Sequence, residues 1–395
     1  MNILKLIKRK SSLFDDDLKA HAQEIKDCIK NSRILVIGAA GTIGKATSIE
    51  LFKREPRALH LVDISENNTV ELVRDIRSSL GYIDGDFRTF IADFGSDEFE
   101  ALIKKEGPYD YIFNLSALKH VRSEKDQFSL MRMINVNILY PLKLLNFAEE
   151  MNCKKLFCVS TDKATNPVNM MGASKLIMEM FLINEDYSVN ISMARFANVA
   201  FSDGSLLHGF NQRLLKKQPI SAPKDVKRYF ITPQESGELC LLSGILGKKG
   251  EIFFPKMTED FHLLKFSDIA SDYLKQMNYQ PYECESESQA RELSIKLIQK
   301  GKWPCYFFDS DTTGEKGYEE FFSEKENVDQ NYFKSIGTIK KETCFNSNVI
   351  SNFTDGIEKL KSDGNWNKDD ILDLFYQVLP DFDHKRTGKN LDQKM

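Results

Sequence analysis

A short apolar run followed at once by three spaced glycines constrains the fold of this chain more than any other feature. Residues 33–37 read RILVI, a composition rich in β-branched residues that favours a buried parallel strand. Gly38, Gly41 and Gly44 follow in the pattern GxxGxxG, and a helical stretch comes next. A glycine turn of this kind lets a pyrophosphate reach the backbone and the unpaired N–H groups of a helix N-terminus. The segment therefore predicts a dinucleotide-binding strand–turn–helix unit.

Strands and helices continue to alternate along the chain as far as residue 196. Short apolar strands are expected at 33–37, 59–63, 87–92, 109–115, 155–160 and 191–196. Helical stretches separate most of them, at 43–54, 66–80, 96–105, 130–151 and 172–184. This alternation predicts an α/β fold, a Rossmann-like doubly wound parallel sheet with right-handed crossovers.

An acidic residue at the end of the second expected strand indicates which dinucleotide binds. Asp63 follows Gly44 by 19 residues, and a carboxylate there accepts hydrogen bonds from the adenosine ribose and repels a 2′-phosphate. We therefore expect NAD rather than NADP as the cofactor. Asp93, after the third expected strand, lies where an adenine contact is expected, with a plain helix N-cap as the alternative. The loop and strand ends thus nominate these cofactor-binding residues: Gly38, Gly41, Thr42, Ile43, Gly44, Asp63 and Asp93.

The charge balance and the cysteine pattern limit which kinds of partner and which cellular compartment are expected for this chain. Lys and Arg number 54 against 58 Asp and Glu, and this balance argues against nucleic acid as the main partner. No run of 18 apolar residues occurs, so no transmembrane segment is expected. Seven cysteines without a CxxC pair indicate reduced thiols and a cytoplasmic protein. The six histidines are isolated, and no metal site is expected.

The first residues of the chain are basic. Lys8, Arg9 and Lys10 follow a short, broken apolar stretch, which is the reverse of a secretory signal peptide. A frayed cytosolic terminus is favoured over a contact with a membrane surface. From Asp15 onward, Leu18 and the apolar residues after it recur at helical spacing and predict one helix that ends at residues 31–32.

The segment 159–175 holds the candidate chemistry. It reads VSTDKATNPVNMMGASK and begins at the carboxyl end of the fifth expected strand, where open α/β sheets bind their ligands. The GxxGxxG spacing resembles the short-chain dehydrogenase/reductase superfamily. The combination of Thr-Asp-Lys with Met-Gly-x-x-Lys resembles the nucleotide-sugar 4,6-dehydratases of the polysaccharide-biosynthesis family, which act on UDP-N-acetylglucosamine. Segments 117–121, 228–232 and 314–320 are similar to further parts of that family, and the resemblance covers roughly residues 32 to 322.

The resemblance implies a site and a reaction. It adds the following cofactor contacts: Leu115, Ser116, Ala117, Asn137, Ser160 and Lys175. In the implied reaction, oxidation of the sugar at C4 makes the C5 hydrogen acidic, water leaves across C5 and C6, and hydride returns to C6. The family assigns the acid that protonates the leaving hydroxyl to Asp162 and the base that takes the C5 proton to Lys163. In water an aspartate is ionised and a lysine is protonated, so both roles require burial. The alternative is a solvated Asp–Lys pair at a strand end.

One position departs from the wider superfamily. Most short-chain dehydrogenases use Tyr-x-x-x-Lys, whereas this chain has Met171 at the tyrosine position and keeps Lys175. A thioether cannot take the proton from the O4 hydroxyl. We expect Thr161 to relay that proton to Lys175 or to solvent, or Lys175 to take it directly. Other members that resemble this sequence share Met-Gly-x-x-Lys, so the change does not by itself indicate an inactive protein.

Substrate contacts are expected from the looser half of the chain. The segment 195–199 resembles the family segment whose asparagine contacts a nucleotide-sugar phosphate, and this resemblance makes Asn198 a candidate for the diphosphate. Arg228 is the other candidate, since arginine pairs with phosphate oxygens in a bidentate manner, with a surface salt bridge as its alternative. Lys119 belongs to a segment that resembles the family and is expected to face the substrate. The family has Arg-Pro where this chain has Thr312 and Thr313, and Lys316 is the candidate that compensates.

These observations predict a division of the chain into parts. The expected parts are an N-terminal helical extension (1–31), an NAD-binding Rossmann domain (32–200, with 234–250 returning to it), a smaller intertwined α/β substrate-binding lobe (201–233 and 251–322), and a C-terminal extension of unassigned role (323–395). Within them, 219–232 is expected to be irregular, 281–304 to be an insertion relative to the family, and helices to form near 207–217, 234–246, 287–300 and 367–378, with a strand at 305–308.

The leading prediction is an NAD-dependent UDP-N-acetylglucosamine 4,6-dehydratase that serves surface polysaccharide or glycoconjugate synthesis, as a homo-oligomer by analogy. Two alternatives stay open. One is an epimerase of UDP-N-acetylhexosamines that uses the same 4-keto intermediate, and the other is a catalytically inactive NAD-binding scaffold or sensor. Retention or inversion at C5 is left open.

Overall fold

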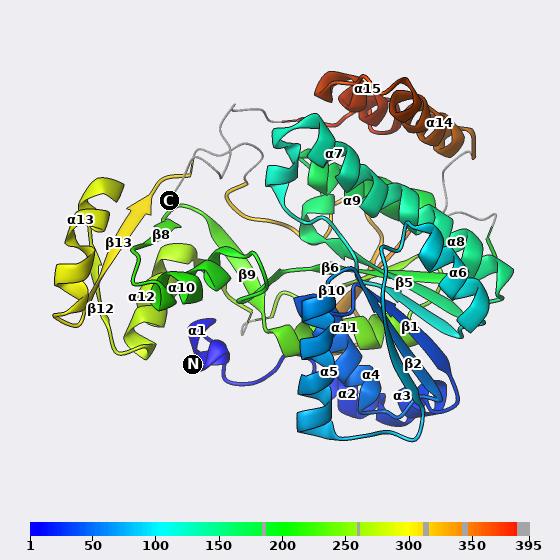
Figure 1. Cartoon of the computed structure of the whole chain (residues 1–395), viewed down its shortest axis with the longest axis horizontal. Helices are drawn as coiled ribbons and strands as arrows, with labels where there is room; N and C mark the ends of the chain where they lie inside the picture. Colours follow the sequence, from blue (N-terminus) through cyan, green and yellow to red (C-terminus); the bar gives the residue numbers. More distant parts are fainter. Residues whose placement is uncertain (184–186, 259–260, 311–315, 342–346, 385–395) are drawn as a thin grey trace.

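The computed structural model describes residues 1–183, 187–258, 261–310, 316–341 and 347–384, and its centre is a nine-stranded sheet (Figure 1). The strands of this sheet are β1 (Arg33–Ile37), β2 (Ala58–Asp63), β3 (Asp86–Ile91), β4 (Tyr111–Asn114), β5 (Lys155–Thr161), β6 (Asn190–Phe196), β10 (Glu251–Pro255), β14 (Val328–Asp329) and β15 (Ile336–Lys340). Their order is β14-β15-β10-β6-β5-β4-β1-β2-β3. The strands from β10 to β3 in this order are parallel, whereas β15 runs antiparallel to both β10 and β14. The predicted doubly wound α/β fold is confirmed, and the strand order reverses between β1 and β4, where such sheets bind ligands.

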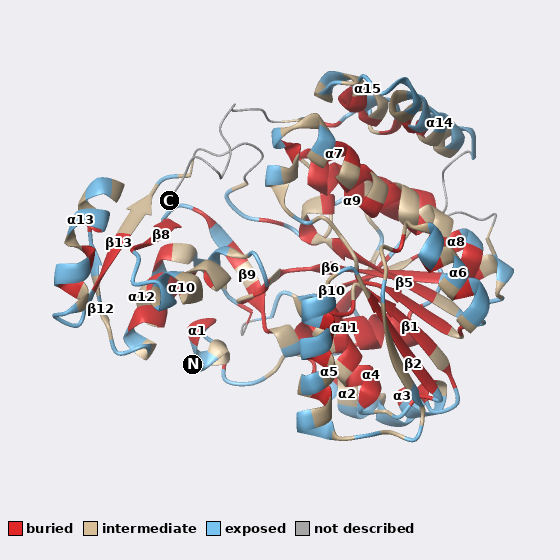
Figure 2. Ribbon diagram, in the orientation of Figure 1, coloured by how far each residue is buried: buried red, intermediate tan, exposed pale blue. Residues whose placement is uncertain are grey.

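Helices cover both faces of the large sheet, which explains why its central strands are apolar throughout. One face carries α3 (Ala22–Ile29), α4 (Thr42–Phe52), α5 (Glu66–Leu80) and α11 (Pro233–Leu246), and the other carries α6 (Asp97–Glu106), α7 (Gln127–Ile134), α8 (Tyr140–Glu150) and α9 (Met170–Leu182) (Figure 1). In Figure 2 the strands at the centre of the sheet are buried and the outer surfaces of the helices are exposed. The helix expected at 130–151 is divided by a π-helical turn between α7 and α8.

The prediction of a frayed N-terminus is wrong. Residues Ile3–Leu6 form the short helix α1, and Leu6 packs in the apolar core of the small lobe. The guanidinium of Arg9 donates to both carboxylate oxygens of Glu235 in α11, at 2.6 and 2.5 Å, and this ion pair is fully buried. The single helix expected after Asp15 is two, α2 (Asp15–Ala20) and α3, which meet at His21.

The small lobe lies beside the carboxyl ends of the large sheet's strands and contains two three-stranded sheets (Figure 1). Its strands are β7 (Asn198–Val199), β8 (Ile220–Pro223), β9 (Lys227–Ile231), β11 (Leu263–Lys265), β12 (Gln280–Glu283) and β13 (Lys302–Phe308), and its helices are α10 (Leu206–Leu215), α12 (Phe266–Gln276) and α13 (Glu287–Ile298). The expectation of an irregular 219–232 is wrong, because β8 and β9 form there as members of the two sheets. The segment expected as an insertion forms a parallel β12–α13–β13 unit.

Two segments lie in the large sheet rather than in the parts to which the sequence analysis assigned them. Strand β10, expected in the substrate lobe, pairs with β6, and β15, expected in the C-terminal extension, pairs with β10. Open edges of a sheet attract further strands because their backbone groups are unpaired.

Beyond β15, helices α14 (Ser347–Asp363) and α15 (Lys368–Val378) pack over α7 and α9 (Figure 1). The sequence pattern predicts α15 but not α14.

Candidate active site

A cavity of about 600 Å³ lies at the carboxyl ends of β1, β4, β5 and β6. It brings together most of the residues that the sequence nominated: Gly38, Gly41, Thr42, Ile43, Gly44, Leu115, Ala117, Lys119, Ser160, Thr161, Asp162, Lys163, Lys175, Asn198 and Arg228. The other nominated residues are outside its lining: Asp63, Asp93, Ser116, Asn137 and Lys316. Residues of the Rossmann sheet and of the small lobe therefore share one cavity.

The glycine loop at one end of the cavity is packed too tightly for side chains. Gly38 has φ +74°, and a Cβ there would lie 2.7 Å from the backbone nitrogen of Ser116. A Cβ on Gly44 would lie 2.0 Å from the carbonyl oxygen of Gly38. Asp63 supports the loop, since its Oδ2 accepts a hydrogen bond from the Ala40 N–H at 2.8 Å. The first turn of α4 follows directly, and the N–H groups of such a turn have no acceptor within the helix, so the loop fits a dinucleotide pyrophosphate.

Asp93 precedes helix α6 but does not form its N-cap. The side chain of Ser96, not that of Asp93, caps α6 by accepting a hydrogen bond from the Phe99 N–H. Asp93 instead pairs with Arg132 of α7 at 2.5 Å. The N-cap alternative is therefore wrong, and the adenine contact stays a prediction.

Asn137 lies in the π-helical turn Asn135–Leu139 and is fully buried. Its side-chain amide accepts from the Leu118 N–H and donates to the Leu118 carbonyl, both at 3.0 Å, and it also donates to the Ser174 hydroxyl at 3.0 Å. A π turn displaces one residue from regular helix geometry, which is common next to functional sites. Asn137 thus joins the loop after β4 to α9, and it positions the cavity wall from behind rather than lining it.

Asp162 and Lys163 form the polar centre of the cavity. They follow β5 in a short 3₁₀ turn, and Lys163 Nζ donates to Asp162 Oδ1 at 3.0 Å. The side chains are 5% and 20% exposed, so they are not the solvated pair that was the alternative. The Thr161 hydroxyl donates to the same Asp162 oxygen at 3.0 Å.

Glu319 lies in the segment 314–320 that resembles the family, and the sequence pattern gives it no role of its own. Its carboxylate is 4% exposed, lines the cavity, and lies 3.9 Å from the Lys163 nitrogen, 3.8 Å from that of Arg228 and 3.7 Å from that of Lys316. Burial raises the pKa of Glu319. Its Oε2 has no hydrogen-bond partner in the part of the chain that the structure describes. The sequence offers two adjacent glutamates, and only the fold distinguishes buried Glu319 from exposed Glu320.

The expected substrate residues are placed in three different ways. Arg228 is nearly fully buried and donates to the carbonyls of Lys316 and Gly317, so the alternative of a surface salt bridge is wrong. Asn198 lines the cavity, and its buried Nδ2 finds no hydrogen-bond partner among the described residues. Lys316 donates to the Thr165 carbonyl at 2.9 Å, which places it behind the cavity lining. Thr312 and Thr313 lie outside the described residues.

Lys175 and Met171 both line the cavity from α9. Lys175 Nζ donates to the Val159 carbonyl at 2.9 Å, and burial lowers the pKa of Lys175 to about 8. The expected relay from Thr161 to Lys175 is not formed: no hydrogen bond joins the two across the described ranges, because the Thr161 hydroxyl points to Asp162. Lys119, which lines the same cavity, also has its pKa lowered by burial.

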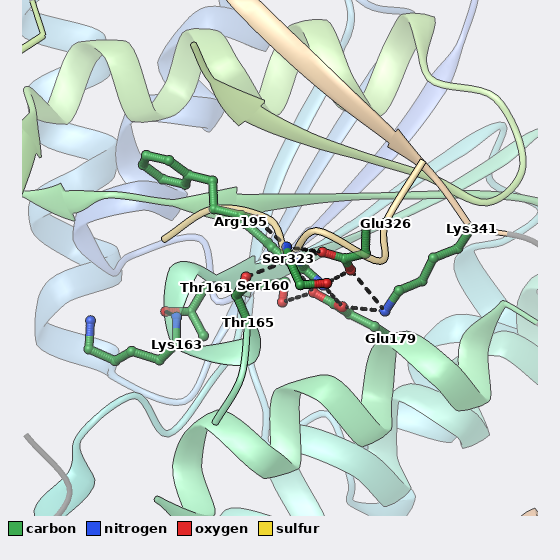
Figure 3. Close-up of polar contacts among 10 residues, drawn as sticks. Ser160, Thr161, Lys163, Thr165, Glu179, Arg195, Ser323, Glu326 and Lys341 are labelled. Carbon is green, nitrogen blue, oxygen red and sulfur yellow. Dashed lines mark hydrogen bonds and ion pairs between the residues drawn. The ribbon is translucent and has the colours of Figure 1, made fainter. Parts of the chain in front are cut away.

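A buried ionic network lies directly behind the turn that carries Asp162 and Lys163 (Figure 3). Arg195 at the end of β6 donates to both oxygens of Glu179, at 2.9 and 2.7 Å, and to both oxygens of Glu326, at 2.9 and 2.8 Å. Glu179 also accepts from Ser160 at 2.6 Å and from Lys341 at 2.8 Å. Burial alone would raise the pKa of Glu179, but the charges of Arg195 and Lys341 lower it to about 2. The network ties the end of β5 to α9 and to the chain on either side of β15.

The chain belongs to the family of polysaccharide biosynthesis proteins, whose model matches residues 34–341. Among the relatives of this chain, an uncharacterized membrane protein of Methanocaldococcus jannaschii is 31% identical over 77% of this chain and 84% of its own length. The capsular polysaccharide biosynthesis protein CapD of Staphylococcus aureus is 28% identical over 85% of this chain, which spans only 52% of that relative. A UDP-N-acetylglucosamine 4,6-dehydratase (inverting) of Campylobacter jejuni is 25% identical over 66% of this chain and 77% of its own length.

Solved structures share the fold at lower identity. Pen from Bacillus thuringiensis superimposes with a TM-score of 0.64 at 21% identity, over 80% of this chain and 92% of its own. The dTDP-glucose 4,6-dehydratase DesIV from Streptomyces venezuelae, solved with NAD and TYD bound, superimposes with a TM-score of 0.56 at 16% identity, over 73% of this chain and 87% of its own. None of the helices in the described part of the chain combines the length and apolar composition that a membrane crossing requires.

Proposed function

We propose that the protein is an NAD-dependent 4,6-dehydratase that converts UDP-N-acetylglucosamine to a UDP-4-keto-6-deoxy-N-acetylhexosamine for polysaccharide biosynthesis. The observation that carries the proposal is the Asp162–Lys163 pair, hydrogen-bonded at 3.0 Å in the same cavity as the glycine loop. Family membership and the similarity to the Campylobacter jejuni dehydratase support it. Elimination of water needs one acid and one base side by side, and epimerisation does not.

The glycine loop would hold the cofactor. Gly38, Gly41 and Gly44 would let the backbone approach the pyrophosphate, and Asp63 would accept hydrogen bonds from the adenosine ribose. When bound, NAD would take a hydride from C4 of the sugar and return one to C6. For the O4 proton, Lys175 is the candidate acceptor, because it lines the cavity and its pKa is lowered to about 8 by burial. Thr161, bonded to Asp162, would orient the acid instead of relaying that proton.

The acid and the base are assigned within the pair. Transfer of one proton from Lys163 Nζ to Asp162, along their 3.0 Å hydrogen bond, turns an ion pair into a carboxylic acid and a free amine. The proposed reaction starts from this neutral pair. Lys163 would then take the C5 proton while Asp162 protonates the departing C6 hydroxyl, which leaves as water. C5 would regain a proton when hydride is delivered to C6.

Incubation with UDP-N-acetylglucosamine, followed by mass spectrometry of the product, tests the proposal. The expected result is a product lighter by the mass of one water molecule. A product of unchanged mass with altered NMR couplings would support the epimerase alternative. Unchanged substrate across a panel of UDP-sugars would contradict both enzymatic readings and favour a scaffold or sensor.

Glu319 gives a prediction with a matched control. After Lys163 has taken the C5 proton, its ammonium would lie 3.9 Å from the Glu319 carboxylate, which stabilises the new charge. Glu319→Gln should therefore lower kcat by about tenfold to a hundredfold with little change in KM. The neighbouring Glu320 is exposed, and Glu320→Gln should leave both constants unchanged. Equal kcat and KM values for the two variants would contradict the role of Glu319 in stabilising the Lys163 ammonium.

Asp63 gives a prediction for the cofactor. Asp63→Asn removes the negative charge that would accept the ribose hydroxyls, and charge-assisted hydrogen bonds contribute about 1.5–3 kcal/mol each. We expect NAD to bind about tenfold to a hundredfold more weakly, measured by titration calorimetry of the apoprotein. Asp84→Asn, at an exposed carboxylate, is the control and should bind like the wild type. Unchanged NAD affinity in Asp63→Asn would contradict the assignment.

A further inference from the structure

The C-terminal helices form a common core with the helix that carries Met171 and Lys175. Phe353 of α14 contacts Phe181 of α9 at 5.6 Å between ring centroids and Phe375 of α15 at 5.7 Å, and all three rings are buried. The family match ends at residue 341, so the family model does not cover this helical pair. The end of α15 leads directly back toward the cavity.

The residue that reaches the cavity from this segment is His384. Its ring stacks on Phe382 at 5.5 Å between centroids, and its Nε2 lies 2.9 Å from Glu124 Oε2. The His384 and Glu124 side chains are 5% and 8% exposed, and both line the cavity, as does Lys368 at the start of α15. The cavity wall beside Met171 is thus completed by residues that the family model does not cover.

Glu124 transmits this contact to the first turn of α9. Its Oε1 accepts hydrogen bonds from the Met170 and Met171 N–H groups, at 2.7 and 3.3 Å. These N–H groups have no acceptor within the helix, so Glu124 pairs donors that the first turn of α9 would otherwise leave unpaired. The next residue, Gly172, is packed so closely that a Cβ on it would lie 2.3 Å from the carbonyl oxygen of Lys163. A displacement of this turn would move the backbone that carries the proposed base.

We propose that residues 347–384 complete the active site, and that His384 is a positioning residue that acts through Glu124 to hold the first turn of α9 against Lys163. The inference rests on the proposed function for the role of Lys163. The positional part of the inference stands on the contacts themselves. The apolar core under α14 and α15 holds the end of this segment beside the cavity. The hydrogen bond from His384 to Glu124 then connects the segment to the first turn of α9.

The kinetic test compares three variants of the full chain acting on UDP-N-acetylglucosamine. His384→Ala should lower kcat by about tenfold to a hundredfold with KM nearly unchanged, since a small misplacement of a catalytic group has effects of this size. His384→Gln should restore most of the rate because its amide N–H can also donate to Glu124. Asp383→Ala, at the exposed neighbouring residue, should behave like the wild type. A raised KM at unchanged kcat, or no rescue by glutamine, would overturn the positioning role.

Hydrogen–deuterium exchange of the same proteins separates this inference from the proposed function. In His384→Ala the amides of Met170 and Met171 should exchange faster than in the wild type, whereas in Asp383→Ala they should not change. Faster exchange in a protein that leaves UDP-N-acetylglucosamine untouched would refute the proposed function and keep the positional link. Unchanged exchange in His384→Ala, with the wild type active, would refute the link alone.

Discussion

Replacement of Lys163 by methionine should lower the rate of product formation by about a thousandfold or more, because it removes the proposed base for the C5 proton. Methionine has nearly the same length and no proton acceptor. The Lys163 side chain is 20% exposed and Asp162 loses only this partner, since Thr161 still donates to the same oxygen. The variant should therefore fold normally, and its thermal midpoint should stay close to that of the wild type. Single-turnover measurements by mass spectrometry give the rate.

The control for this variant is Lys154→Met, because Lys154 is an exposed lysine just before the amino end of β5, away from the cavity, with a surface ion pair to Asp110. Surface pairs of this kind contribute little, and the control should react at the wild-type rate. If Lys163→Met kept more than about a tenth of the wild-type rate, Lys163 would not be the base and the elimination would need another group. Asp162 would then be the first residue to re-examine.

Replacement of Glu179 by glutamine should destabilise the protein by about 3–5 kcal/mol, the usual cost of removing one partner from a buried ion pair. Glu179 is fully buried and joins Arg195 to Lys341 behind the Asp162–Lys163 turn (Figure 3). The variant leaves Arg195 with Glu326 as its remaining carboxylate partner among the described residues. Urea unfolding at neutral pH measures the free energy of unfolding. Glu71→Gln, at an exposed helical glutamate, is the control and should stay within about 0.5 kcal/mol of the wild type.

The difference between Glu179→Gln and the wild type should depend on pH in a defined direction. The pKa of Glu179 is lowered from 4.5 to about 2 in the folded protein, so the folded state favours the ionised carboxylate. This contribution, about 3 kcal/mol, is complete above pH 4.5 and is lost as the pH falls from there toward 2. The two unfolding free energies should therefore converge as the pH is lowered. A constant difference between neutral pH and pH 3 would contradict the role assigned to the Glu179 charge.

The sequence predicts the features that local pattern controls. The apolar runs, the spaced glycines and the segment 159–175 place the cofactor loop and the Asp162–Lys163 turn at the same edge of the sheet, because the carboxyl ends of parallel strands meet there. The strands β8 and β9 were missed because Pro223 and the surrounding polar residues mask their periodicity. Short strands that depend on pairing with distant partners carry little signal of their own.

The residues that the sequence could not place are those whose burial depends on chain segments far apart. Arg9 and Glu235 read as separate surface charges, and only the fold joins them. Glu319 and Glu320 are the same residue type, yet Glu319 lines the cavity and Glu320 is exposed. His384 lies 260 residues from Glu124, and no local pattern relates them. Contacts of this kind are set by packing, which selects one side chain among many of the same chemical type.

A single labelled substrate tests the central claim, an internal oxidation and reduction coupled to loss of water. UDP-N-acetylglucosamine with deuterium at C4 is incubated with the protein as purified and a catalytic trace of NAD, and the product is analysed by NMR and mass spectrometry. The expected product is a 4-keto-6-deoxy sugar nucleotide that has lost one water molecule and carries the deuterium in its C6 methyl group. Deuterium retained at C4 of a sugar that still has its C6 hydroxyl would contradict it.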